Sequence, residues 1–352
     1  MTAARTAPSR RPAASRPRGS KAKSVPKAKS VPVPKATAAA RRPHPSGARP
    51  RAVARGPEDV LAGLRVRVTH PEKPYWPDDG YTKLDLLRFY VEAFDLYQPY
   101  VADRLLSFRR CPEGMLGSCF FQKEKPAGMP PDTPTKRIQH VQKSTNYVVG
   151  GRLETHLSAA NMGCIAIHVW NSRTRDPRQP DWICFDLDPD SGLFADAVRA
   201  AFRVKAALDA LELVSFPKTS GGKGLHVFVP IRTGPDTDDV LRFAERLGTH
   251  LAAAYPKELT MESRIASRKG RVYLDPFRNG FGQTVCAPYS VRRRAKAPFS
   301  MPLSWDEVKP TMDPTSYNIG SAARTLRRPD PWKDFWTARQ STARAFKAVD
   351  KL

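Results

Sequence analysis

The sequence predicts an α+β fold in which mixed or antiparallel sheets are flanked by helices. From Trp182 onward the predicted elements follow the order strand, helix, strand, turn, strand, helix, strand, strand. One pair of strands is joined directly by a glycine-rich turn, and the last two strands follow each other without a helix. A doubly wound parallel sheet alternates strands with helices, so this order favours the α+β class over that alternative.

The elements before residue 140 are short and separated by turn residues. Val66–Thr69 is predicted to be a strand. Thr82 and Asp85 resemble a capping box, with Asp in the place of Glu or Gln, so we expect a helix from there to about Leu96. Two strands and a proline-rich loop are expected next, at Leu105–Arg110, Cys119–Phe121 and Pro126–Pro134.

The later elements have clearer patterns. Two amphipathic runs predict helices, at Phe194–Leu213 and Asp236–Tyr255. Apolar runs predict strands at Cys164–Trp170, Trp182–Asp188, Val214–Lys218, Leu225–Ile231, Arg271–Asp275 and Thr284–Tyr289. Residues 321–352 are rich in Arg and Trp, and we expect them to form a basic helical segment that packs on or extends residues 56–320.

The first 55 residues differ from the rest of the 352-residue chain. They contain 15 Lys and Arg, nine Pro, and no Asp, Glu, Phe, Trp or Tyr, whereas the whole chain has a formal net charge of +25. Such a segment cannot bury enough apolar surface to offset its ordering entropy, so residues 1–55 are predicted to be a disordered basic Ala/Pro/Lys/Arg tail. The tail reads either as a solvated linker or as a segment that binds a polyanion.

Several classes of protein are disfavoured. The chain starts with no apolar signal segment and contains no apolar run long enough to span a membrane, so a membrane partner is not expected. Its five cysteines are odd in number and include no CxxC motif. This predicts a reducing, cytoplasmic location and argues against a disulfide framework or a structural zinc site.

Two aspartates at the end of an apolar strand are the strongest local signal. Asp186 and Asp188 alternate with core residues, so both carboxylates project from the same face of the strand. Neighbouring carboxylates repel each other unless a cation lies between them, and hard divalent ions prefer such oxygen ligands. Asp275 ends another apolar strand and is a third candidate ligand. For the first pair alone, a solvated strand end is about equally plausible.

A glycine-rich turn between two strands is a candidate anion site. The run from Lys218 to His226 lacks the glycine and hydroxyl positions of a P-loop. Its glycines would still let backbone N–H groups approach an anion, and Ser220 and Lys223 would add a hydroxyl and a charge. The plain alternative, slightly favoured by the local sequence, is a hairpin turn with surface lysines.

Other candidates have weaker signals. Arg292 follows an apolar strand, and Arg268 precedes the strand of Asp275. His168 lies within a strand, where a histidine is more often a core residue than a catalytic one. The Phe120–Phe121 pair is normally a core feature, although aromatic pairs beside lysines also stack on bases.

Taken in order, these motifs resemble the polymerase module of bacterial DNA ligase D, a member of the archaeo-eukaryotic primase superfamily. The resemblance extends from about Val66 to Glu307. It rests on the motifs GYTK at 80–83, FFQK at 120–123, DLDP at 186–189, SGGKGLH at 220–226, APYSVR at 287–292 and MPLSWDE at 301–307. It implies a primase-polymerase-like fold with one catalytic domain, residues 56–320.

The resemblance also implies roles for individual residues. Asp186, Asp188 and Asp275 match the catalytic ligands of two metal ions, Mn²⁺ or Mg²⁺. The residues that match the nucleotide site are His168, Ser220, Lys223, His226 and Arg292, with Arg268 as a further contact. The residues that match the contacts to a DNA 5′-phosphate and the template strand are Lys73, Lys83, Phe120 and Phe121.

The implied activity is template-directed nucleotidyl transfer, with primer extension and gap filling at DNA ends during non-homologous end joining. The implied substrates are gapped duplexes with a 5′-phosphate and nucleoside triphosphates, with ribonucleotides preferred over deoxyribonucleotides. No K-x-D-G ligase motif occurs, so we expect a stand-alone polymerase. The resemblance also implies a nucleoid-associated location and, as partners, a separate ligase and a Ku-like end-binding protein. Two alternatives remain open: a primase that starts chains de novo, and a non-catalytic DNA-end-binding factor.

Overall fold

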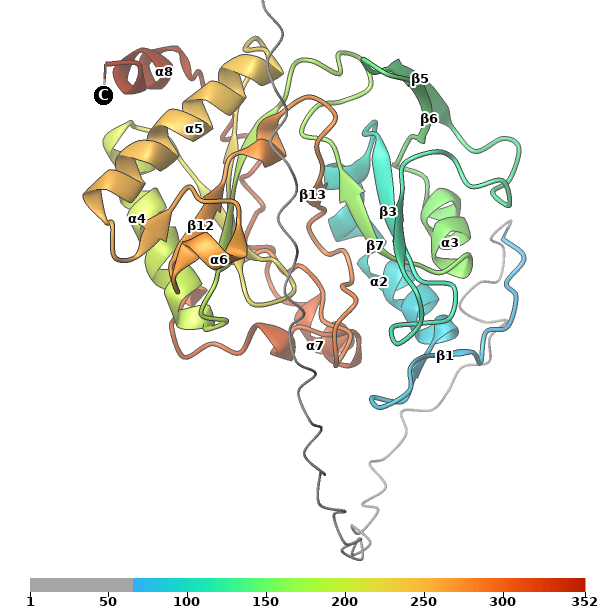
Figure 1. Cartoon of the computed structure of the whole chain (residues 1–352). Coiled ribbons are helices and arrows are strands. Elements are labelled where there is room, and N and C mark those ends of the chain that lie inside the picture. The colour runs from blue at the N-terminus through green and yellow to red at the C-terminus, as the bar shows by residue number, and fades with distance from the viewer. Residues whose placement is uncertain (1–65, 352) are drawn as a thin grey trace, which may run out of the picture. The chain divides into compact units, whose positions relative to one another are not determined.

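The computed structural model describes residues 66–351, in which two sheets each have helices packed against them (Figure 1). The predicted tail, residues 1–55, lies outside the described residues. The larger sheet has the strand order β11-β12-β8-β10-β9. It is antiparallel except for the parallel pair of β11 and β12, so this mixed sheet confirms the predicted α+β class. Its strands are β8 (Trp182–Pro189), β9 (Phe216–Thr219), β10 (Leu225–Pro230), β11 (Leu259–Thr260) and β12 (Val272–Asp275).

Helices α4 (Phe194–Ala210) and α5 (Thr237–Ala254) pack against this sheet. Phe185 of β8 meets Phe243 of α5, with ring centroids 6.5 Å apart. Because side chains alternate along a strand, this apolar packing leaves Asp186 on the opposite face of β8. The helices therefore anchor one face of the sheet, and the carboxylates project from the other.

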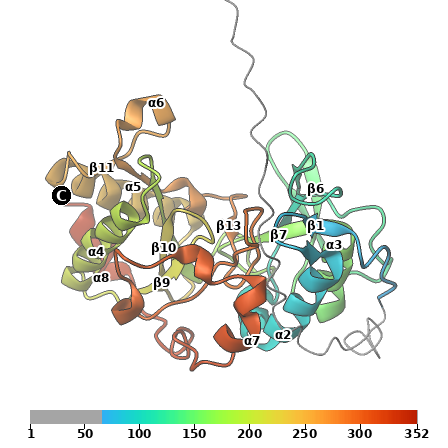
Figure 2. The ribbon, with the colours of Figure 1, turned by 90° about the horizontal axis from the view of Figure 1, so that it is seen from below.

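The second sheet has the strand order β13-β7-β3-β4 and is antiparallel throughout. Its strands are β3 (Leu106–Arg110), β4 (Phe120–Gln122), β7 (Cys164–Val169) and β13 (Val285–Cys286). Helix α2 (Lys83–Val101) begins at the predicted capping box of Thr82 and Asp85 and packs on α3 (Leu153–Asn161). Figure 2 shows α2 and α3 on the side of β7, and α4 and α5 on the side of β10.

Some predicted elements are wrong or incomplete. Val66–Thr69 is not a strand. The strand predicted at Thr284–Tyr289 is reduced to Val285–Cys286, because Pro288 lacks an N–H group and Tyr289 has a φ of 63°. The elements that the sequence did not reveal have mixed polar patterns or only a few residues: β1 (Pro74–Trp76), β2 (Tyr81–Thr82), β5 (Thr135–Gln139), β6 (Ser144–Val148), β11, α3 and α6 (Ile265–Arg268).

A disulfide joins Cys111 and Cys119, which corrects the expectation that the cysteines stay reduced. Arg110 of β3 pairs with Phe120 of β4, so these two cysteines are the next opposed positions of the hairpin. The odd cysteine count could not reveal this pair, because the pairing depends on the register. The other three cysteines are buried free thiols, as expected for most of them.

The C-terminal segment contributes aromatic side chains to the core. It contains two short helices, α7 (Ala322–Thr325) and α8 (Ala343–Val349), rather than one continuous helix. Trp332 stacks on Phe335 with ring centroids 4.7 Å apart, and Trp332 also contacts Phe228 of β10 at 5.5 Å. Within residues 66–351, no helix is both long and apolar enough to cross a membrane.

Candidate active site

A row of four side chains crosses the larger sheet. The register places Lys218 of β9 opposite His226 of β10, His226 opposite Asp186 of β8, and Asp186 opposite Asp275 of β12. Directly opposed residues share one face of a sheet. The ammonium group of Lys218, the imidazole of His226 and two carboxylates therefore lie side by side. Asp188 lies two residues beyond Asp186 on that face.

Asp186 is held by two neighbours. His226 Nε2 lies 3.2 Å from Asp186 Oδ1, and Arg278 Nε lies 3.0 Å from Asp186 Oδ2. Burial alone would raise the pKa of Asp186, but the contacts with His226 and Arg278 outweigh it and hold that pKa well below its usual range. Asp186 is therefore a carboxylate at neutral pH.

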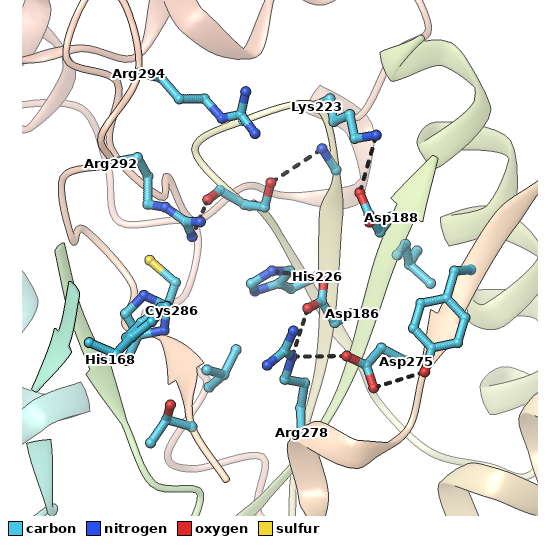
Figure 3. Close-up of a pocket in the computed structure, with 18 of the residues that line it drawn as sticks. His168, Asp186, Asp188, Lys223, His226, Asp275, Arg278, Cys286, Arg292 and Arg294 are labelled. Atoms are coloured by element: carbon cyan, nitrogen blue, oxygen red, sulfur yellow. Dashed lines mark hydrogen bonds and ion pairs between the residues drawn. The ribbon is translucent and has the colours of Figure 1, made fainter. Parts of the chain in front are cut away.

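Asp275 is in a different electrostatic situation. Burial raises its pKa above the usual value, and the neighbouring charge of Asp186 adds to this effect, although Arg278 opposes it. Arg278 Nε lies 3.1 Å from Asp275 Oδ2, while the backbone N–H of Phe277 donates to Asp275 Oδ1 at 3.0 Å. Figure 3 shows Arg278 between Asp186 and Asp275.

Asp188 is also paired with cations. Arg268 Nη1 donates to Asp188 Oδ2 at 2.8 Å, and Lys223 Nζ lies 3.6 Å from Asp188 Oδ1. The three aspartates thus have the oxygen donors that Mn²⁺ or Mg²⁺ prefers. As they stand, however, no three acidic, His or Cys side chains within residues 66–351 converge closely enough to hold a metal ion. Carboxylate oxygens are suitable ligands for divalent cations, but here they contact basic side chains instead.

The turn between β9 and β10 faces an arginine segment that contains Arg292 and Arg294. Gly224 N–H donates to Ser220 Oγ at 3.2 Å, and Arg292 Nη1 donates to the Ser220 carbonyl at 2.9 Å. Gly221 has a φ of +70°, and a Cβ at this position would lie 2.4 Å from Arg292 Cγ. Glycine is therefore needed here, both for the backbone conformation and for the close approach of Arg292. Lys223 and Arg294 also line this side of the cavity.

Two histidines line the cavity in neutral form. Burial lowers the pKa of His226 to about 4, and the nearby positive charge of Lys218 contributes. Because Asp186 accepts from Nε2, the buried Nδ1 of His226 is left without a hydrogen-bond partner among the described residues. Burial, with a contribution from Arg292, also places the pKa of His168 well below its usual value. His168 lies opposite Cys286 on β13, on the wall that faces the aspartates.

The structure brings most of the predicted site residues to one cavity of about 360 Å³. The predicted residues that line it are Phe121, His168, Asp186, Asp188, Ser220, Lys223, His226, Arg268, Asp275 and Arg292. Three predicted residues do not line it: Lys73, Lys83 and Phe120.

The two lysines lie together on the side of β1 and β2. The backbone N–H of Lys83 donates to the Lys73 carbonyl at 2.9 Å. Lys73 Nζ lies 2.7 Å from a Glu113 carboxylate oxygen, whereas Lys83 Nζ donates to the Thr69 carbonyl. Burial lowers the pKa of Lys83, and repulsion from Lys73 lowers it further. Phe120 and Phe121 are exposed by 46% and 57%, which excludes the core alternative for this pair.

Several residues of the cavity and its surroundings were not predicted from the sequence. Arg278, Arg294, Tyr273, Thr284 and Cys286 line the cavity, and Lys218 is fully buried behind it. Arg278 follows Asp275 by three residues, and that proximity could have identified it. Tyr273, Cys286 and Lys218 are placed by strand register, and Thr284 and Arg294 by the segments next to strands, for which the sequence had no local signal.

Known proteins resemble this chain in sequence and in fold. Residues 82–332 match the family described as "LigD, primase-polymerase domain". The chain is 32% identical over 298 residues to the multifunctional non-homologous end joining protein LigD of Pseudomonas aeruginosa, covering 80% of this chain and 34% of that protein. It is 31% identical over 259 residues to the LigD protein of Mycolicibacterium smegmatis, covering 73% of this chain and 34% of that protein. The chain thus spans about a third of the length of these relatives.

The fold also matches a solved structure, the polymerase domain from Mycobacterium tuberculosis ligase D in complex with DNA. The TM-score is 0.73 and the sequence identity is 26%, and the match covers 78% of this chain and 98% of that chain.

Proposed function

We propose that this chain, which belongs to the LigD primase-polymerase domain family, performs template-directed nucleotidyl transfer at DNA ends. The observation that carries the proposal is one cavity in which three aspartates face a glycine-rich turn and an arginine segment. Carboxylates on one wall and anion-binding groups on the other suit a nucleoside triphosphate with bound metal ions.

The turn side of the cavity would bind the triphosphate. Ser220 and Lys223 would contact phosphate oxygens, and Arg292, tied to the Ser220 carbonyl at 2.9 Å, would add a second positive charge. The Nδ1 atom of His226 is buried and unpartnered among residues 66–351, so it can accept a hydrogen bond from the substrate side. His168 and Phe121, on the opposite wall, would face the sugar and base.

The aspartate side would perform the chemistry. Asp186, Asp188 and Asp275 would hold two divalent ions, Mn²⁺ or Mg²⁺, which supply activation of the primer 3′-hydroxyl and neutralisation of the pyrophosphate leaving group. Asp186 is ionised at neutral pH because His226 and Arg278 stabilise its charge. The chain's own contribution is to position the α-phosphate for in-line attack and to balance the charge of the phosphates.

The remaining predicted residues would hold DNA. Lys73 and Lys83 lie together and would bind the 5′-phosphate of a gap or break. Phe120 and Phe121, both exposed, would support the template strand by stacking. The relatives carry the name of non-homologous end joining proteins, so we propose that pathway as the setting, with a ligase and a Ku-like end-binding protein as partners. We also propose a preference for ribonucleotides and a nucleoid-associated location.

The proposal is tested with a labelled primer on a gapped duplex that carries a 5′-phosphate. In the presence of Mn²⁺ and one nucleoside triphosphate, we expect the primer to gain the templated nucleotide, with faster incorporation of ribonucleotides. Asp186→Asn should bind the same DNA but not extend it. Extension by Asp186→Asn at the wild-type rate would contradict the proposal.

The same assay separates the two alternatives. A primase would form products on an unprimed single strand, and a non-catalytic end-binding factor would bind the gapped duplex without extending the primer. We expect primer-dependent extension because the three aspartates and the phosphate-binding groups share one cavity.

A further inference from the structure

Arg278 lies between two of the three aspartates. Its Nε atom is 3.0 Å from Asp186 Oδ2 and 3.1 Å from Asp275 Oδ2 (Figure 3). These two aspartates are directly opposed on β8 and β12, so their carboxylates would repel each other strongly without a cation. The guanidinium group thus occupies the position from which one cation can neutralise both carboxylates.

The backbone of Arg278 is held by hydrogen bonds, whereas its side chain is partly exposed to solvent. Asn171 Nδ2 donates to the Arg278 carbonyl at 3.1 Å. The next residue, Asn279, makes two hydrogen bonds to the backbone of Cys184, both at 2.8 Å. The Arg278 side chain is 39% exposed and lines the cavity. It can therefore leave the carboxylates by rotation of its own side chain, without a change in the fold.

The other carboxylate oxygens of this cluster are also in contact with basic groups. His226 lies at Asp186 Oδ1, Arg268 at Asp188 Oδ2 and Lys223 at Asp188 Oδ1. Arg278 differs from these three residues because it bridges two of the three aspartates, whereas each of them contacts only one. While Arg278 contacts both Asp186 and Asp275, no three acidic, His or Cys side chains within residues 66–351 are placed to hold a metal ion.

We propose that Arg278 is an exchangeable counter-cation that competes with a divalent metal ion for Asp186 and Asp275. In the metal-free protein it neutralises the two carboxylates, and it is released from them when the ion binds. This inference rests on the proposed metal site of a nucleotidyl transferase. It makes metal affinity depend on a side chain that is not a ligand, and it frees a guanidinium group inside the phosphate-binding cavity when the ion enters.

The test measures Mn²⁺ binding by electron paramagnetic resonance of the free ion, with the full chain and without nucleotide or DNA. We expect Arg278→Gln to bind the first Mn²⁺ ion at least tenfold more tightly than the wild type. Arg278→Lys keeps the charge but cannot bridge two carboxylates with a planar group, so it should give an intermediate affinity. The matched control is Arg292→Gln, which removes a guanidinium of the same cavity that contacts the Ser220 carbonyl rather than an aspartate.

Three outcomes would overturn the inference: unchanged Mn²⁺ affinity in Arg278→Gln, weaker affinity in that variant, or an equal gain in Arg292→Gln. A second measurement uses the wild-type chain and covers the case in which Arg278→Gln does not fold. The Nε–H resonance of Arg278, assigned by comparison with Arg278→Lys, should move on addition of Mg²⁺, and an unmoved resonance at saturating Mg²⁺ would contradict release.

Failure of the proposed function is distinguishable from failure of this inference. Asp186→Asn should lose Mn²⁺ binding whether or not Arg278 competes for the site. If that variant binds Mn²⁺ like the wild type, the proposed metal site itself is wrong. If it loses binding while Arg278→Gln gains nothing, the metal site stands and only the exchange is refuted.

Discussion

Lys218 of β9 lies directly opposite His226 of β10, and both side chains are buried. Lys218 Nζ donates to Ser300 Oγ and lies 5.4 Å from the Phe228 ring centroid, and it pairs with no carboxylate among residues 66–351. Burial lowers the pKa of Lys218 to about 8. An unpaired cation in this position costs stability, and it also adds positive potential behind the turn that we expect to hold phosphates.

We therefore expect Lys218→Met to weaken nucleotide binding without destabilising the fold. The Michaelis constant for the nucleoside triphosphate should rise about tenfold, since one buried positive charge near the phosphates is lost. The free energy of unfolding at pH 7 should stay the same or rise by about 1 to 3 kcal/mol, because the desolvation cost of the ammonium group disappears. Steady-state kinetics and chemical denaturation measure the two effects. Loss of stability together with an unchanged Michaelis constant would refute this role.

The same lysine predicts a pH dependence of stability. Its pKa is about 8 in the folded chain and 10.5 in the reference state, so the unfolded chain binds more protons between these values. The unfolding free energy attributable to Lys218 must therefore rise as pH increases from 8 toward 10. The difference in stability between wild type and Lys218→Met should narrow over that range. Lys309→Met, which removes an exposed lysine, serves as the matched control.

The contact between Lys73 and Glu113 bears on the proposed recognition of a 5′-phosphate. A phosphate that binds Lys73 must compete with the Glu113 carboxylate, which lies 2.7 Å from its ammonium group. Lys73→Ala and Lys83→Met should each weaken binding of a 5′-phosphorylated gap about tenfold, the usual scale for one charge-assisted contact. Glu113→Gln should strengthen it. Fluorescence anisotropy with matched 5′-phosphate and 5′-hydroxyl duplexes measures this, and equal changes for both duplexes would contradict a phosphate contact.

We expect the disulfide between Cys111 and Cys119 to stabilise the folded chain. It closes a short loop, with a sequence separation of 8 residues, so the chain-entropy model gives a stabilisation of about 2.5 kcal/mol. Denaturant titration of Cys111→Ser/Cys119→Ser should show a loss of that order. Thiol counting on the unfolded, unreduced chain should find three thiols, because Cys164, Cys184 and Cys286 are free. A count of five would show that the disulfide does not form in solution.

The sequence was informative where local patterns determine structure. The alternation around Asp186 and Asp188 predicted a strand with carboxylates on one face, and the capping box at Thr82 predicted the start of α2. Both signals lie within a few adjacent residues, where backbone geometry sets which side chains share a face or a hydrogen bond.

The sequence contained no signal for the register between strands or for the pairing of strands that lie far apart in the chain. The glycine-rich turn indicates that the strands of Lys218 and His226 are neighbours, but it does not set their register, and nothing near Cys111 indicates its register with Cys119. The role of Arg278 depends on the pairing of β8 with β12, which joins segments about ninety residues apart. Such contacts are set by packing and register, and a single sequence contains no direct signal for them.

We expect the basic tail, residues 1–55, to make DNA binding depend on salt concentration without changing the rate of catalysis. Residues 1–55 lie outside the described residues, and they contain 15 Lys and Arg without any acidic residue. If they neutralise Z phosphates, the logarithm of the DNA association constant should fall with the logarithm of salt concentration with a slope of about −0.9Z. Deleting residues 1–55 should flatten that slope while turnover at saturating DNA stays the same. An unchanged slope would refute a role in DNA retention.

The two exposed phenylalanines should separate nucleotide binding from DNA binding. Phe121 lines the cavity and lies 5.4 Å from His168 between ring centroids, whereas Phe120 lies outside the cavity. Phe121→Ala should therefore raise the Michaelis constant for the nucleotide as well as weaken DNA binding. Phe120→Ala should weaken DNA binding alone, by about 1 to 3 kcal/mol if it stacks on one base. Anisotropy titrations and single-nucleotide incorporation measure both effects, and identical behaviour of the two variants would show that the cavity wall formed by Phe121 does not contact the nucleotide.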